Sequence, residues 1–127
     1  MVLLPSDFQV EQLTLKDIKS AYTLIEKDIC VTPVFNFPEF DSLVDFANCI
    51  NAYFKAELFQ ETGAFKFRGV CHSVALLTPA ELANGVVTHS SGNHGIALSY
   101  HAQQKGIPCH IVLVGTSCSQ MVNFSLP

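Results

Sequence analysis

The sequence predicts an α/β fold on three observations. Strand-like and helix-like patterns alternate along the chain, and in one region a strand, a loop, a helix and a second strand follow each other directly. Hydrophobic residues make up 49% of the 127 residues and charged residues only 14%, which excludes a disordered tail. A chain of this length can bury about two-thirds of its unfolded surface in one domain.

The first predicted helix follows Thr14 and runs to about Lys27. Thr14 and Asp17 have the spacing of a capping box, in which each side chain bonds the other residue's backbone amide. One face of this helix carries apolar residues at helical spacing, namely Ile18, Ala21, Tyr22 and Ile25. We therefore expect a surface helix with a buried stripe.

The next segment is predicted to be extended and then helical. Pro33 disfavours a helix at Thr32, so "CVTPVF" should be extended, and "NAYFKAELF" alternates like a strand that ends near Leu58. Thr62 is placed to cap a helix that carries Lys66 in its first turns. The apolar residues of that helix are Val70, Val74 and Leu77.

The segment "TPAELANG" predicts a short helix from several agreeing signals. Thr78 stands at the N-cap, Pro79 at the first helical position, Glu81 at the third, and Gly85 after the end.

A strand–loop–helix–strand unit is expected after this helix. "VVTH" predicts a buried strand, "SSGNHG" a loop, "IALSYHAQQK" a helix closed by Gly106, and "IPCHIVLV" a second strand. Such connections join parallel strands in nearly all cases. After Val114 we find turn-forming residues but no further periodicity.

Charge and cysteine usage exclude several classes of protein. A formal net charge of −4 offers no basic surface for nucleic acid. The cysteines are odd in number and scattered without a CxxC pair, which predicts reduced thiols: Cys30, Cys49, Cys71, Cys109 and Cys118. The five histidines lack metal-binding spacing, so we predict no metal site. The N-terminus has no signal-peptide or membrane-span pattern, and a cytoplasmic protein is expected.

Lys66 lies between two phenylalanines in "ETGAFKFRG", residues 61–69, and the residues allow two interpretations. In one, the rings and the lysine point in different directions, because neighbouring helix residues project about 100° apart. In the other, the rings and the positive helix N-terminus disfavour the ammonium form, leaving a neutral amine that can attack a carbonyl. Arg68 is expected to be solvated or salt-bridged on another helix face.

The loop "SSGNHG", residues 90–95, is a second candidate site. It follows a predicted strand and leads into a helix, which is where open α/β sheets bind ligands. Gly92 and Gly95 permit close approach of a ligand, while Ser90, Ser91 and Asn93 offer short polar side chains. The residues alone also allow a polar turn that binds nothing.

Together, "ELFQETGAFKFRG" and "VVTHSSGNHGIALSYHAQQKGIPCHIVLV" resemble the serine racemase and serine/threonine dehydratase family of fold type II pyridoxal-phosphate enzymes. The resemblance covers roughly residues 31–114. It implies that pyridoxal 5′-phosphate is the cofactor and that Lys66 forms the Schiff base with it. By the same resemblance Asn93 contacts the 3′-oxygen of the pyridine ring, and Phe65 packs beside the ring.

The resemblance also implies an activity. Ser91 matches the serine of the racemases, where threonine dehydratases usually have alanine, and it implies an acid/base on the cofactor face opposite Lys66. Inverting a Cα centre needs a proton removed on one face and delivered on the other. A serine racemase that is also an L-serine (threonine) ammonia-lyase is therefore expected, with serine and then threonine as substrates.

The family architecture implies three segments. Residues 1–84 would be the N-terminal part of the large domain with the Schiff-base lysine, 85–114 the start of the small domain, and 115–127 a divergent or truncated tail. Parallel βαβ units in three layers and an incomplete two-domain architecture are expected. The full-length form is expected to be a cytoplasmic homodimer with no nucleic-acid or membrane partner.

Family members are more than twice this length. The glycine-rich loop for the cofactor phosphate and the acidic divalent-cation site are both missing from this sequence. Two interpretations follow: an inactive fragment of a racemase/ammonia-lyase, or a non-catalytic α/β module that binds or poisons a full-length relative.

Overall fold

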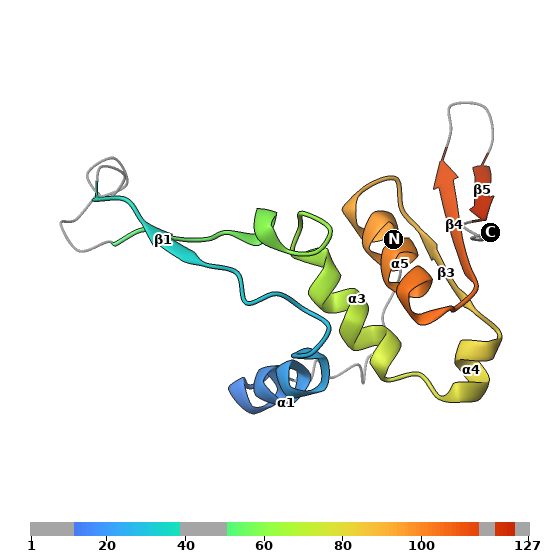
Figure 1. Cartoon of the computed structure of the whole chain (residues 1–127), viewed down its shortest axis with the longest axis horizontal. Coiled ribbons are helices and arrows are strands. Elements are labelled where there is room, and N and C mark those ends of the chain that lie inside the picture. The colour runs from blue at the N-terminus through green and yellow to red at the C-terminus, as the bar shows by residue number, and fades with distance from the viewer. Residues whose placement is uncertain (1–11, 39–50, 115–118, 124–127) are drawn as a thin grey trace, which may run out of the picture.

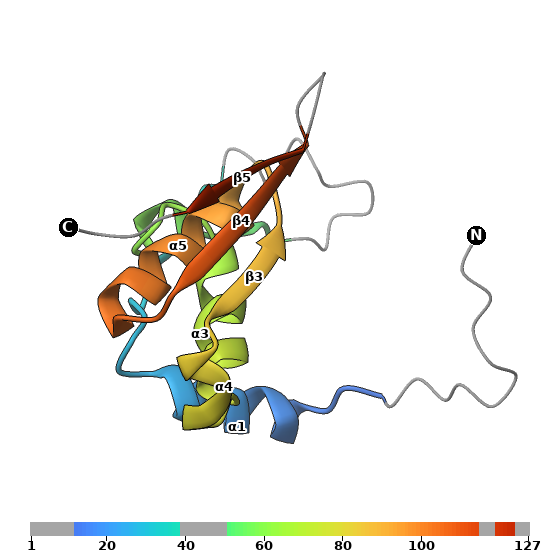
Figure 2. The ribbon, with the colours of Figure 1, turned by 90° about the vertical axis from the view of Figure 1, so that its right-hand side faces the viewer.

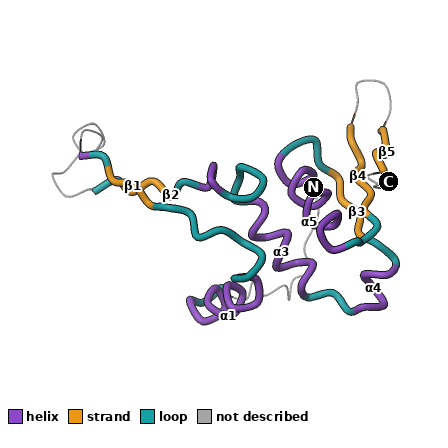
Figure 3. Tube along the Cα trace, in the orientation of Figure 1, coloured by secondary structure: helices purple, strands orange, loops and turns teal. Residues whose placement is uncertain are grey.

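The structure, a computed structural model, describes residues 12–38, 51–114 and 119–123. Helices pack together beside a small sheet, and a thin two-stranded ribbon extends away from them (Figure 1, Figure 3). In chain order the elements are α1 (Leu15–Ile25), β1 (Val34–Asn36), β2 (Tyr53–Lys55), the 3₁₀ helix η1 (Glu57–Phe59), α3 (Lys66–Ala75), α4 (Pro79–Ala83), β3 (Val86–His89), α5 (Asn93–Lys105), β4 (Cys109–Val114) and β5 (Ser119–Asn123).

The three-stranded sheet has the order β3-β4-β5. β3 and β4 are parallel, with Val86 opposite Cys109 and His89 opposite Val112, while β4 and β5 are antiparallel. α5 connects β3 to β4 and packs against both strands, and Figure 2 shows the strands side by side. The predicted strand–loop–helix–strand unit with parallel strands is confirmed.

The apolar core lies between α3, α5 and the end of α1. Phe67, Val70 and Cys71 of α3 are buried against α5, whose alanines at positions 97 and 102 are also buried. The Phe67 ring meets the Tyr100 and His101 rings edge to face, with centroids 5.8 and 5.6 Å away. Small residues on α5 let the two helices approach closely, so the start of α3 is fixed relative to α5.

Both predicted capping boxes are present. Thr14 with Asp17 begins α1, and Thr78 with Glu81 begins α4. Hydrogen bonding to the threonine holds the pKa of each acidic side chain below its usual value. α5 ends at Gly106, which has the left-handed conformation (φ 66°) that glycine adopts most easily.

The predicted start of α3 was wrong in detail. Lys66 is indeed in the first turn, but Thr62 does not cap the helix, which begins only at Lys66 with Phe65 as N-cap. The chain first makes a turn in which the Gly63 amide donates to the Gln60 carbonyl at 2.7 Å, with Gly63 at φ 69°. That turn buries the Thr62 hydroxyl, which has no hydrogen-bond partner in the described part of the chain.

Three element lengths also differ from prediction. The strand predicted to end near Leu58 stops at Lys55, because residues 57–59 form the 3₁₀ helix. α1 ends at Ile25 rather than Lys27, and α5 starts at Asn93, three residues earlier than predicted. Half of the "SSGNHG" motif is therefore the first turn of a helix.

Two predicted buried surfaces are open instead. On α1 only Ile25 is buried, whereas Ile18 and Tyr22 are 53% and 42% exposed, because α1 reaches the core only through its last turn. On β3, Val87 is 67% exposed and alternate residues are partly covered, since α5 covers one face of the strand. Both patterns are amphipathic, but amphipathicity does not show whether a covering element is present.

The segment after Val114 contains an element that we did not predict. β5 pairs with β4 from Ser119 opposite Val114 to Asn123 opposite His110. This pairing depends on backbone hydrogen bonds along an open strand edge, which require no alternation of side chains. The absence of periodicity was therefore not evidence against a strand.

Candidate functional site

Lys66 is the first residue of α3 and its side chain is exposed. Its Nζ lies 5.1 Å from the centroid of the Phe65 ring, within reach of a cation–π contact. Phe65 is itself 61% exposed, but Phe67 is only 2% exposed and belongs to the core. The two rings therefore point in different directions from each other, and neither interpretation holds in full: Phe67 points away from the lysine into the core, while Phe65 lies beside it. The expectation that both rings shield the lysine was wrong for Phe67, because helical spacing turns it about 100° away from Lys66 and into the core.

Arg68 forms the ion pair that we expected as one alternative. Its Nε and Nη2 donate to the two carboxylate oxygens of Glu57 at 2.8 and 2.7 Å. Nη2 also donates to the Cys30 carbonyl at 3.1 Å and to the Thr32 hydroxyl at 3.3 Å. Arg68 thus joins α3 to η1 and to the segment that leads into β1.

The Arg68 guanidinium lowers the pKa of Glu57 to about 2 against the opposing effect of burial, and the Thr32 hydroxyl, donating at 2.6 Å, adds to the shift. Because the folded pKa lies below the ordinary value of 4.5, this contribution to stability is present above about pH 4.5. It is lost as the pH falls from 4.5 towards 2.

We therefore expect acid to destabilise the wild-type chain more than the Glu57→Gln variant. Between pH 4.5 and 2 the free energy of unfolding should fall by about 2–3 kcal/mol more in the wild type. Urea titrations of both proteins at several pH values in this range measure the difference. If the free energy of unfolding fell equally with pH in both proteins, the Glu57–Arg68 pair would make no pH-dependent contribution to stability.

The polar loop after β3 is organised by Ser90, a role that the sequence analysis missed. Its Oγ accepts hydrogen bonds from the Gly92 amide at 3.3 Å and the Gly95 amide at 3.0 Å. Ser90 therefore does what an N-cap side chain would do, since the N-cap of α5 is Gly92. A serine two residues before a glycine N-cap was the signal available in the sequence.

Gly95 allows α5 to pack closely on this loop. A Cβ there would lie 3.1 Å from the Ser90 carbonyl oxygen and 3.3 Å from the Ile111 side chain. Ser91 and Asn93, in contrast, are exposed, and their side chains make no hydrogen bond within the described residues. Two polar side chains are thus held at a helix N-terminus and remain available to a ligand.

The structure places both candidate motifs at the same end of the helical layer. α3 and α5 run in the same general direction, so that both begin towards the end where β3 finishes (Figure 1, Figure 2). Phe67 contacts Tyr100, which is two turns along α5 from Asn93, or on the order of 10 Å along the axis. The start of α3, where Lys66 lies, is therefore at the same end of the helical layer as the loop before α5.

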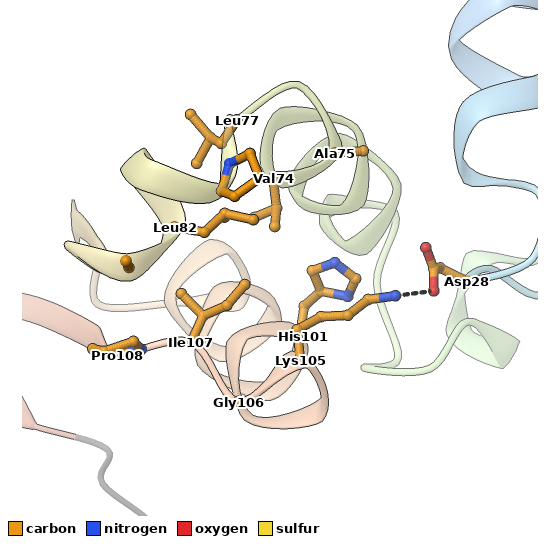
Figure 4. Close-up of a pocket in the computed structure, with 12 residues that line it drawn as sticks. Asp28, Val74, Ala75, Leu77, Leu82, His101, Lys105, Gly106, Ile107 and Pro108 are labelled. Carbon is orange, nitrogen blue, oxygen red and sulfur yellow. Dashed lines mark hydrogen bonds and ion pairs between the residues drawn. The ribbon is translucent and has the colours of Figure 1, made fainter.

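Two cavities within the described part of the chain bear on the site, and Lys66 lines neither of them. A hollow of about 120 Å³ beside Ser91 is smaller than the roughly 300 Å³ that small-molecule pockets usually offer. A larger cavity of about 650 Å³ lies between the ends of α3 and α5 and the short α4 (Figure 4). It includes the Lys105–Asp28 ion pair, but neither Lys66 nor any residue of the "SSGNHG" loop.

His101 lines the larger cavity and contacts Cys71, and burial argues against a nucleophilic role for either residue. Cys71 Sγ is 3.6 Å from His101 Nδ1, but burial raises the pKa of this thiol to about 11. Burial also lowers the pKa of His101. A protonated thiol beside a neutral imidazole is a packed core contact.

Comparison with known proteins identifies the family. A family model described as "Pyridoxal-phosphate dependent enzyme" matches residues 25–124, a range that includes both motifs. The chain belongs to this family. The expected resemblance and the mixed α/β fold class are confirmed, and the family is one of enzymes.

Individual relatives are racemases and dehydratases. A serine racemase of Dictyostelium discoideum is 44% identical over 111 residues, which are 87% of this chain and 33% of that protein. The crystal structure of serine racemase from the same organism has a TM-score of 0.71 and 46% identity, covering 80% of this chain and 32% of that structure. A beta-hydroxyaspartate dehydratase of Paracoccus denitrificans is 41% identical over 104 residues, 82% of this chain and 32% of that protein. The chain thus spans about a third of the length of these relatives.

Proposed function

We propose that this chain is part of a pyridoxal-phosphate-dependent serine racemase that also acts as an L-serine ammonia-lyase. The observation that supports this most is an exposed lysine at the start of α3 and an unbonded serine in the loop that leads into α5, at the same end of both helices. The similarity to serine racemases and to a dehydratase supports the same pair of activities. Serine is the proposed substrate, and threonine is the second candidate.

Three exposed side chains of the candidate site suit pyridoxal phosphate. Lys66 offers an exposed amine for its aldehyde, and Phe65 offers a ring beside that amine. Asn93 offers an unbonded amide for the ring 3′-oxygen. When bound, this cofactor supplies an electron sink for the carbanion at the substrate Cα. In a protein with the family's remaining parts, a divalent cation would bind elsewhere.

The two candidate catalytic side chains then have complementary tasks. Lys66 Nζ removes or returns the Cα proton on one face of the substrate, and Ser91 Oγ does so on the other. Racemisation needs both groups. Elimination of the β-hydroxyl from L-serine needs proton removal on one face only, so it depends on Lys66 and much less on Ser91.

For the chain alone we propose no catalytic activity. It contains no glycine-rich segment to bind the cofactor phosphate, and the hollow beside Ser91 is too small to enclose the cofactor. We further propose that the completed protein, in which these residues are joined to the remaining part of a relative such as the Dictyostelium enzyme, is a cytoplasmic homodimer. Cys30, Cys71 and Cys109 are free thiols, which suits that location. No helix in the described ranges is long and apolar enough to cross a membrane.

The 127-residue chain, mixed with stoichiometric pyridoxal phosphate, should show no visible absorption band from lysine-bound cofactor. The physical reason is that a phosphate dianion without a cradle of amide donors contributes little binding. Absorption spectra of the wild type and of Lys66→Ala measure this. A wild-type band that vanishes in Lys66→Ala would contradict the proposal that the chain alone is inactive.

A second candidate is a non-catalytic module that binds a full-length relative. It is favoured by the exposed apolar side chains in the segment that precedes Lys66, namely Leu58, Phe59 and Phe65. Co-purification of the chain with a full-length relative, together with loss of that relative's activity, would support this candidate.

A further inference from the structure

We propose that Arg68, held by Glu57, is a positioning residue that fixes where α3 begins and therefore how Lys66 is presented. This inference rests on the proposed function of Lys66. Neither Arg68 nor Glu57 need touch substrate or cofactor for this role. Their effect on Lys66 is transmitted through the backbone of a single helical turn.

α3 lacks the side-chain contacts that usually stabilise the start of a helix, so another contact must hold its first turn in place. Its N-cap, Phe65, makes no side-chain capping bond, and no acidic residue lies in its first turn. α1 and α4 each begin with a complete capping box. The Phe67 and Arg68 amides donate only to the carbonyls of the preceding turn, at 3.4 and 3.2 Å, and a helix start without a side-chain cap tends to fray. Fraying would let the first residue, Lys66, change direction.

The Arg68 side chain supplies the missing constraint. Its bidentate pair with Glu57 fixes α3 to η1, and its bond to the Cys30 carbonyl fixes both to the segment before β1. The guanidinium is rigid and planar, so two parallel bonds define its orientation as well as its position. One side chain thus ties together three parts of the chain that are distant in sequence.

Gln60 completes this network on the side of Cys30. Its Oε1 accepts from the Cys30 amide at 2.9 Å, and its Nε2 donates to the Cys30 carbonyl at 3.1 Å. Gln60 is buried, and its backbone carbonyl accepts the hydrogen bond that forms the turn at Gly63. The turn before α3 is therefore anchored at both ends, by Gln60 and by Arg68.

Helical spacing explains why an arginine two residues after Lys66 can do this without entering the site. Residues i and i+2 project about 200° apart, so a partly buried Arg68 leaves Lys66 on the exposed side. A second ion pair offers a comparison, because Lys105 Nζ lies 2.7 Å from an Asp28 carboxylate oxygen, the same distance as between Arg68 and Glu57. That second pair joins the end of α5 to the segment after α1 and has no part in the turn before Lys66.

The test compares Glu57→Gln with Asp28→Asn in the 127-residue chain. Each substitution turns one carboxylate into an amide and weakens one ion pair. Hydrogen exchange reports the opening of the first turn of α3 through the Phe67 and Arg68 amides. Reductive labelling with millimolar pyridoxal phosphate, followed by peptide mass spectrometry, gives the ratio of label on Lys66 to label on Lys19, which is exposed on α1.

In Glu57→Gln we expect exchange of these amides to speed up at least about tenfold. The Lys66 to Lys19 labelling ratio, above one in the wild type because Phe65 lies beside the amine, should fall towards one. Asp28→Asn should change neither quantity more than about twofold. Arg68→Lys, which keeps the charge but not the paired bonds, should behave like Glu57→Gln.

Three results separate the inference from the function on which it rests. Equal exchange in the two amide variants would overturn the inference. Faster exchange in Glu57→Gln, with a Lys66 to Lys19 labelling ratio that stays as high as in the wild type, would overturn it as well. The order of the turn would then not determine how Lys66 reacts. A wild-type ratio near one would overturn the inference, because an ordered turn would then give Lys66 no advantage over Lys19, and it would leave the proposed function intact, since that function requires the completed protein.

Discussion

Replacing Ser91 with alanine in the completed protein is expected to abolish racemisation of serine while sparing elimination from L-serine. Loss of one positioned acid/base group costs about 10²–10⁴-fold in rate, and only racemisation needs a group on both faces of Cα. Ser91 is suited to this substitution because its side chain is exposed and makes no hydrogen bond within the described residues. The fold of the loop should therefore be unaffected.

The two activities are measured on the same preparation, by chromatography of the serine enantiomers and by pyruvate release. Ser73→Ala on the exposed side of α3 is a matched control and should change neither rate. Ser90→Ala should lower both rates together, because the Ser90 hydroxyl holds the Gly92 and Gly95 amides. Equal loss of both activities in Ser91→Ala would remove Ser91 from the proposed two-base mechanism.

Replacing Lys66 with alanine in the completed protein should have a larger and broader effect. Both racemisation and elimination should fall by about 10⁴-fold or more, because the same amine would bind the cofactor and move the Cα proton. Lys19→Ala, at an exposed position on α1, is the matched control. Substantial activity of either kind in Lys66→Ala, at the level of the control, would contradict the proposed role of Lys66.

Local signals in the sequence predicted much of the fold. The caps at Thr14, Thr78 and Gly106 were correct because each depends on a few neighbouring residues. The parallel pairing of β3 with β4 was correct because the short connection through one helix leaves few alternatives. Helical spacing also allowed the Phe67 ring to point away from Lys66, and in the structure this ring is buried in the core.

The features that prediction missed depend on contacts between distant segments. Thr62 had the right residue type for a cap, but the turn at Gly63 delays the helix to Lys66. The exposure of Tyr22 and Val87 depends on which elements cover them, and an amphipathic pattern does not contain that information. The ion pair between Arg68 and Glu57 spans eleven residues, so no spacing rule for helices or strands would find it.

For the candidate site, residue identities were accessible from the sequence and their arrangement was not. Lys66, Ser91 and Asn93 were selected from motifs, and the structure places the motifs at the same end of α3 and α5. The role of Ser90 was missed because the helix was expected to begin only at Ile96, so Ser90 was not considered as part of the cap of α5. The larger cavity near His101 would have misled a search by size alone, since Lys66, Ser91 and Asn93 do not line it.

The most direct test of the central claim is to identify which lysine carries the cofactor. The completed protein, loaded with pyridoxal phosphate, is treated with borohydride to make the link permanent, then digested and analysed by peptide mass spectrometry. The account predicts that the added mass lies on Lys66, in the peptide that contains Phe65 and Phe67. Finding the cofactor on another lysine, such as Lys55 or Lys105, would contradict it.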